Sequence, residues 1–235
     1  IGERAFLMPY QAIPKDERRD LQSLFYLFGL GVMCLAPRLP DIKANLDVST
    51  TFFGILMSTG SIGALMAHLT MGYVVHKFGV FKVLLTSATF TYITIAVMVE
   101  TTNPWIYLVV NVISGFAWAS YHISINAQAL HRQADIGQNL IPMLHGLWTA
   151  GAVSTAFIAL LISSRVSLNW HILPLIGSVL ALKIRAIYRL RPVLLSGSEV
   201  NEDDEIVTFG EMMKSFSIDW VVSIGFLCAL MLEFI

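Results

Sequence analysis

The stretch VLLTSATFTYITIAVMV, residues 83–99, decides the fold class, because it lies between Lys82 and Glu100 and contains no charged side chain. A helix needs about 20 mostly apolar residues to cross the hydrocarbon core of a bilayer. Extended to residues 80–99, the stretch reaches that length, and it lacks the polar alternation of a membrane barrel strand. The sequence therefore predicts a transmembrane α-helix over residues 80–99.

The rest of the chain repeats this pattern. Comparable apolar segments lie at 21–39, 52–75, 105–130, 143–164 and 171–190, and a further one begins at 217. The chain is 56% hydrophobic and only 13% charged, whereas soluble domains average about 25% charged residues. A soluble protein of this size cannot cover so much apolar surface. We predict an all-α membrane protein with six transmembrane helices and the start of a seventh.

These segments divide the chain into four parts. We predict a cytoplasmic amino-terminal segment at 1–20, a six-helix bundle at 21–190, a cytoplasmic acidic linker at 191–216 and a truncated seventh helix at 217–235. The linker is too charged to enter a bilayer. Because the chain begins at Ile1 and ends within an apolar run, we expect it to be a fragment of a longer protein.

The distribution of basic residues predicts the orientation. If the amino terminus is cytoplasmic, only Arg38, Lys43 and Arg165 lie outside, and the other 12 of the 15 Lys and Arg residues lie inside. This count includes Lys183 among the inner charges. Membrane proteins carry an excess of Lys and Arg in their cytoplasmic loops. The pattern therefore favours an inward amino terminus.

The apolar segments contain a weak internal repeat, seen when the sequence is shifted by about 92 residues. Gly54-Ile55-Leu56 in the second segment then matches Gly146-Leu147-Trp148 in the fifth. Three helices repeated once must have inverted topology, because three crossings reverse the direction of the chain. Inverted repeats of three plus three helices are a design of transporters. The repeat favours that architecture, although small residues also pack in other helix bundles.

Other classes of function lack support in the sequence. The net charge is −1, so there is no basic footprint for nucleic acid. The motifs of zinc proteases, redox dithiols, serine hydrolases and phosphate-binding loops are missing, and we predict no enzyme, cofactor or metal. Cys34 and Cys228 lie in apolar stretches and are expected to be buried thiols.

Three stretches resemble a known family: GYVVHKFGVFK at 72–82, PRLPDI at 37–42, and Asn126 followed by PMLHG at 142–146. The first is similar to the loop between helices 2 and 3 of the major facilitator superfamily, where Lys77 and Gly79 match but His76 replaces the usual Asp. The other two resemble the fucose-permease-like branch and uncharacterised bacterial inner-membrane members of it. The likeness runs from the first helix into the seventh.

The resemblance implies that this chain is the amino-terminal half of a 12-helix transporter with a central cavity. It implies a secondary active transporter that moves a sugar-like or other small polar solute by alternating access, with proton symport as an option, in a bacterial inner membrane. Its partners would be the solute, protons, the bilayer and the missing carboxy-terminal half. Gly72, Lys77, Gly79 and Lys82 would form a conformational loop, although positive-inside bias alone also explains the two lysines.

Polar residues inside apolar helices are the candidate site. His122 and Asn126 lie one helical turn apart, so both face the same side, and His can change charge near neutral pH. We predict that they bind solute or relay protons, with Tyr121 beside them, and that Gln128 offers further hydrogen bonds. The alternative is hydrogen bonding to neighbouring helices. His145 is predicted to be structural, either as a cap of its helix or through a hydrogen bond to the second segment.

Two charged residues are further candidates. Glu233 lies in the seventh apolar segment, where a carboxylate must be protonated or paired, and we predict a coupling acid or gate there. Arg38 is expected to extend toward the membrane surface. The alternative is a gate in which Arg38 pairs with Asp41 or Glu233.

Two other functions remain open. One is a seven-helix receptor or light-driven pump, although residues 217–235 contain no lysine to hold retinal. The other is a non-transporting membrane scaffold.

Overall fold

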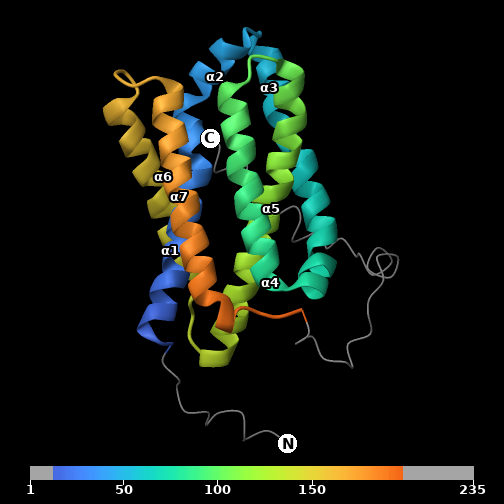
Figure 1. Cartoon of the computed structure of the whole chain (residues 1–235), viewed down its shortest axis with the longest axis vertical. Helices are drawn as coiled ribbons and strands as arrows, with labels where there is room; N and C mark the ends of the chain where they lie inside the picture. Colours follow the sequence, from blue (N-terminus) through green and yellow to red (C-terminus); the bar gives the residue numbers. More distant parts are fainter. Residues whose placement is uncertain (1–12, 198–235) are drawn as a thin grey trace, which may run out of the picture. The chain divides into compact units, whose positions relative to one another are not determined.

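The computed structural model describes residues 13–197, and these residues fold into α-helices and short 3-10 helices with no strand among them (Figure 1). The elements are α1 Lys15–Val32, η2 Met33–Arg38, α2 Leu39–Leu46, α3 Thr50–Ser58, α4 Gly60–Glu100, α5 Pro104–Ile136, α6 Ile141–Ile162, α7 Leu168–Leu190 and η3 Arg191–Val193. The all-α prediction is confirmed for this part of the chain. The predicted seventh helix, Glu233 and Cys228 lie outside the described residues.

Five helical segments within residues 13–197 are long and apolar enough to cross a membrane. They are Lys15–Leu46, Thr50–Glu100, Pro104–Ile136, Ile141–Ile162 and Leu168–Val193. The first begins six residues before the predicted span at 21, because the charged turn at its start is also helical. The predicted count of six spans and the inverted repeat stay predictions.

The second segment is interrupted at Gly79, inside the predicted loop at 76–79. Gly79 has φ 77° and ψ 158°, which is not helical. A straight helix of 51 residues would extend about 75 Å, far beyond the ~30 Å hydrocarbon core. The ribbon instead turns back at this point, and the later part of α4 returns beside the earlier part (Figure 1). Glycine fits here because side chains rarely adopt this backbone conformation.

Local sequence signals explain where two helices begin. The Asn103 side chain accepts hydrogen bonds from the backbone N–H groups of Trp105 (2.9 Å) and Ile106 (3.4 Å), so it caps α5. Pro104 occupies the first turn of α5, where proline is favoured. Leu39–Leu46 forms α2, and only 47–49 connects it to α3.

Close helix packing brings the candidate site together. Gly29 of α1 and Gly151 of α6 touch the opposite helix backbone, and a Cβ atom at Gly29 would collide with the Trp148 carbonyl group. Small residues allow such contact between helices. In the same way, α4 packs against α5 through Gly63 and Gly115. Helix α1 packs against both α6 and α7 and lies between them.

Candidate functional site

His122, Asn126 and His145 meet where α5 packs against α6. The Asn126 Nδ2 group donates to the His122 carbonyl oxygen (2.8 Å), and the Asn126 Oδ1 atom lies 3.2 Å from His145 Nε2. The two imidazole rings contact edge to face, with centroids 6.3 Å apart. His122 and Asn126 both contact His145, so they lie on one side of α5, as their spacing predicts; their role in binding solute or protons stays a prediction. His145 bonds to α5, so the predicted contact with the second segment is wrong.

Aromatic rings flank this cluster, which we call the histidine–asparagine cluster (His122, Asn126 and His145). The His122 ring stacks on Trp118 with an interplanar angle of 8° and a centroid distance of 5.7 Å, and on Phe28 at the same distance. The three polar side chains are half-buried. The cluster thus offers hydrogen-bonding groups beside flat apolar rings, a combination that suits a small polar molecule with an apolar face.

A second group of residues surrounds Lys183, which is 1% exposed. Its Nζ atom lies 3.9 Å from the Tyr121 ring centroid, 4.8 Å from that of Phe28 and 5.1 Å from that of Tyr92. We call this group the lysine cage. Lys183 was counted only among the inner charges, and the structure buries it inside the bundle, within the predicted span at 171–190. A cationic residue in an apolar stretch is the signal that could have identified the lysine cage.

Phe28 joins the two groups, because its ring contacts both His122 and the Lys183 ammonium group. Tyr121 belongs to the lysine cage and is buried. Tyr121 and His122 both contact the Phe28 ring, but only Tyr121 also contacts the Lys183 ammonium group. The Tyr121 hydroxyl is buried and has no hydrogen-bond partner among the described residues.

Arg38 is 2% exposed, so the prediction that it extends to the surface is wrong. Its Nε atom lies 2.7 Å from Asp41 Oδ2. Its guanidinium group also donates to the carbonyl oxygens of Ser163 (3.3 Å) and Val166 (3.1 and 3.2 Å). These carbonyls follow the end of α6, where helices leave acceptors unpaired. The alternative pairing with Asp41 is the one observed.

The conformational-loop residues lie at and around the break in α4. Gly72, Lys77 and Lys82 are exposed, and the Lys77 Nζ atom lies 3.5 Å from the Tyr73 hydroxyl. Gly79 is buried beneath the segment after α7. The backbone N–H of Val80 donates to the Leu195 carbonyl (2.9 Å), so this segment is bonded to the loop.

Gln128 holds the same segment and is not available to a solute. Its Nε2 atom donates to the Val193 carbonyl and its Oε1 atom accepts from the Leu195 N–H, both at 2.9 Å. The side chain is 2% exposed. The suggestion that Gln128 bonds a sugar is therefore wrong for this conformation, because both ends of its amide are occupied.

Ion pairs connect α1 to α5 near the start of α1. Arg132 Nε lies 2.6 Å from Glu17 Oε1, and Arg132 Nη1 lies 2.9 Å from Asp135 Oδ2. Arg132 therefore has partners within this part of the chain. Across residues 13–197, no three His, Cys, Asp or Glu side chains come close enough to hold a metal ion. Cys34 is buried and unpaired, as predicted.

Comparisons with known proteins identify the family. Residues 10–191 match the family model described as "Sugar (and other) transporter". An uncharacterized MFS-type transporter of Yersinia pestis is 25% identical over 207 residues, which is 88% of this chain and 51% of that protein. The chain thus spans about half the length of this relative. No solved structure matches. With its apolar helices and this match over most of its length, the chain is an integral multi-pass membrane protein that belongs to the sugar (and other) transporter family of the major facilitator superfamily.

Proposed function

We propose that this chain is the amino-terminal half of a secondary active transporter that moves a small polar solute, such as a sugar, by alternating access. The family match supports transport of a small solute, and the half-length overlap with the Yersinia pestis relative supports a second half elsewhere in the protein. Such transporters bind solute between two halves that rock against each other. The protein acts as a carrier and not as an enzyme.

The histidine–asparagine cluster carries the proposal for the site. Polar side chains among membrane-spanning helices are costly and mark solute and ion pathways. His122, Asn126 and His145 are joined by hydrogen bonds and ring contacts, yet remain half-buried within residues 13–197. In this proposal they bind solute hydroxyl groups, and the Trp118 ring contacts the apolar face of the solute.

Proton coupling is a separate part of the proposal. His122 and His145 supply imidazole groups as proton carriers, and Glu233 acts as the coupling acid of a symporter. Tyr121 lies one contact away, in the lysine cage. Arg38 fixes the end of α6, and thereby one gate of the pathway.

The membrane topology is also proposed. The chain forms six helices as an inverted three-plus-three repeat, with a cytoplasmic amino terminus and a cytoplasmic linker. The loop at Gly72, Lys77, Gly79 and Lys82 contacts the other half during rocking. The Yersinia pestis relative supports a bacterial inner membrane.

Solute uptake into vesicles tests the function. Vesicles containing the protein are screened for uptake of radiolabelled sugars and other polar metabolites, with and without a pH gradient. We expect uptake that increases with an inward proton gradient and falls at least about tenfold in H122A and N126A. H131A is the matched control, because His131 is exposed and pairs with Asp135 on its own helix. If H122A and E233Q leave uptake and its pH dependence unchanged, the site assignment is wrong.

The receptor and scaffold alternatives are not favoured by the family match. A scaffold would carry no solute, so absence of uptake for every solute tested would favour the scaffold alternative over transport.

A further inference from the structure

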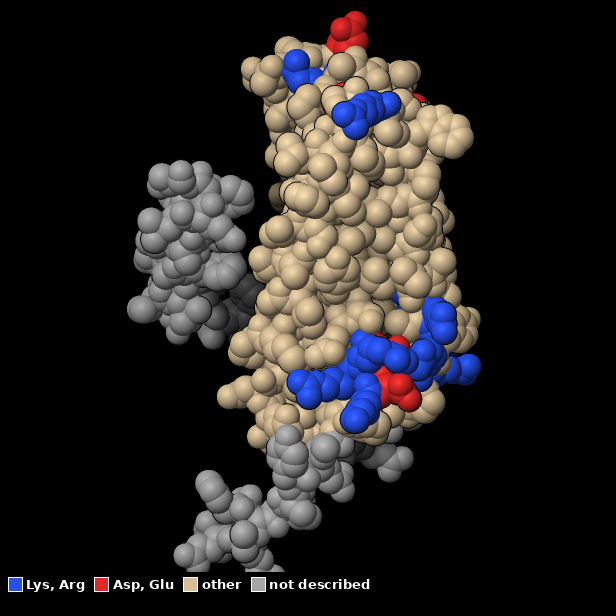
Figure 2. Space-filling view, turned by 90° about the vertical axis from the view of Figure 1, so that its left-hand side faces the viewer, with Lys and Arg blue, Asp and Glu red and all other residues tan. Residues whose placement is uncertain are grey.

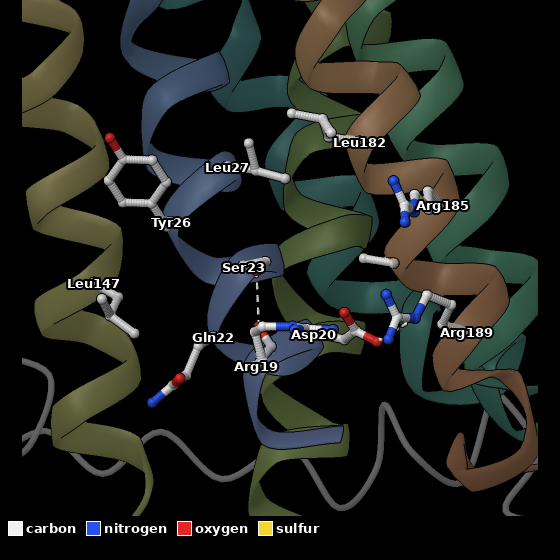
Figure 3. A pocket seen from close by; sticks show the side chains of 11 residues that line it. Arg19, Asp20, Gln22, Ser23, Tyr26, Leu27, Leu147, Leu182, Arg185 and Arg189 are labelled. Carbon is white, nitrogen blue, oxygen red and sulfur yellow. Dashed lines mark hydrogen bonds and ion pairs between the residues drawn. The ribbon is translucent and has the colours of Figure 1, made fainter. Parts of the chain in front are cut away.

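A hollow of about 620 Å³ lies between α1, α6 and α7, on a different face of α1 from the histidine–asparagine cluster (Figure 3). Arg19 and Arg189 lie at one end of it with Arg185 above Arg189, Leu27 and Leu182 lie beyond the three arginines, and Leu147 lies across from them on α6. Neither the histidine–asparagine cluster nor the lysine cage contributes a lining residue. The hollow is therefore separate from the proposed solute site.

The basic end of the hollow carries more positive than negative charge. Arg189 Nε lies 3.0 Å from Asp20 Oδ2, and Arg19 Nη2 lies 3.2 Å from Asp16 Oδ1. Arg185 is exposed and has no carboxylate within ion-pair distance in residues 13–197. One guanidinium group is thus free to bind an anion, and the salt-bridged Arg19 and Arg189 flank it.

The position of the charges in the bundle indicates what kind of anion fits. Figure 2 shows Lys and Arg gathered around a few acidic residues at one end of the molecule, next to a broad band without charged side chains. In a membrane protein such a boundary lies at the level of the lipid headgroups. The hollow has Arg19 and Arg189 at its lower end and Leu27 and Leu182 at its upper end, so its lining changes from charged to apolar along its length.

We propose that this hollow binds an anionic phospholipid, with the phosphate of its headgroup on Arg185 and an acyl chain along Leu27, Leu147 and Leu182. Guanidinium groups bind phosphate oxygens through paired hydrogen bonds, and basic pockets between transmembrane helices bind anionic headgroups. A small soluble anion would use the arginines alone and leave the leucines uncovered. Because α6 also carries His145 of the histidine–asparagine cluster, the bound lipid contacts one helix of the proposed solute site.

Native mass spectrometry of the purified protein in neutral detergent tests this assignment. Dioleoyl phosphatidylglycerol and dioleoyl phosphatidylcholine are added separately, and the apparent dissociation constant of the first bound lipid is measured. We expect phosphatidylglycerol to bind more tightly. The R185Q variant should weaken its binding about fivefold, the effect of one basic residue near a lipid headgroup, and should leave phosphatidylcholine binding unchanged.

The control is R165Q, which removes an exposed arginine far from the hollow and should not change lipid binding. Glycerol 3-phosphate, which has the anionic group without acyl chains, should compete only weakly. Equal binding of both lipids, or equal losses in R185Q and R165Q, would overturn the proposal. Full competition by glycerol 3-phosphate would also overturn it, because the site would then bind a soluble anion. None of these results depends on transport activity.

Discussion

The ammonium group of Lys183 lies 3.9 Å from the centroid of the Tyr121 ring, and no carboxylate within residues 13–197 forms an ion pair with it. Aromatic faces attract cations, but they replace only part of the hydration that a buried charge loses. A buried lysine that contacts only aromatic rings therefore stabilises the fold less than an apolar side chain of the same volume would.

Replacing Lys183 with methionine should therefore stabilise the protein. K183M keeps the apolar stem and removes the charge, and we expect the melting temperature to rise by about 2–4 °C, the change that corresponds to about 1 kcal/mol. Thermal unfolding in detergent measures it. The K183E variant is the opposing control and should lower the melting temperature, because it places an anion against three ring faces. A fall in K183M would mean that the aromatic contacts outweigh desolvation.

Removing the hydroxyl group should affect stability differently at Tyr26 and at Tyr121. The Tyr26 hydroxyl donates to Ser154 Oγ at 2.9 Å and joins α1 to α6, whereas the Tyr121 hydroxyl has no partner among the described residues. Y26F should cost about 1 kcal/mol of unfolding free energy, and Y121F should cost nothing or add stability. Chemical denaturation of both variants checks this. A larger loss in Y121F than in Y26F would show that the Tyr121 hydroxyl is bonded in solution.

Arg38 should be important for stability whatever its part in transport. R38Q removes an ion pair and the hydrogen bonds to Ser163 and Val166, and we expect a loss of about 2–3 kcal/mol. The D41N control removes only the ion pair. Since the Asp41 side chain is 50% exposed, that variant should lose less than about 1 kcal/mol. Equal losses in the two variants would assign the stability to the ion pair rather than to the carbonyl contacts.

Alanine at Gly79 should destabilise the loop, whereas alanine at Gly72 should not. At Gly79 the positive φ costs about 1–3 kcal/mol for a side chain, and a Cβ atom would also lie 3.0 Å from the Gly197 nitrogen. At Gly72 a Cβ atom meets open space within a helix, where alanine is favoured by up to about 1 kcal/mol. Melting temperatures should move in opposite directions. A neutral G79A would show that the chain turns differently at this point.

Local sequence patterns were sufficient to predict much of the fold. Residues 83–99 predicted the helix that is observed there, and Gly79, between the predicted spans at 52–75 and 80–99, lies at the observed break. The pairing of His122 with Asn126 also followed from their spacing, because residues four apart share a helix face. The length of α2 was missed, since short polar turns and short amphipathic helices have similar composition.

The contacts of the charged and polar residues could not be predicted in the same way. Arg38 bonds to carbonyl groups more than 120 residues later in the chain, and Gln128 bonds to a segment 65 and 67 residues away. The lysine cage draws its rings from α1, α4 and α5 around a residue of α7. Sequence spacing says nothing about which helices become neighbours.

The sequence by itself determined that this chain consists of apolar helices separated by polar turns, because helix length and apolar content are local properties that a bilayer selects. Only the tertiary structure decided which polar groups are buried, which are paired and which remain accessible. The physical reason is that Lys183, Arg38 and Gln128 lie in apolar stretches whose local pattern does not specify their neighbours, and helix packing alone brings the rings and carbonyl groups that surround them.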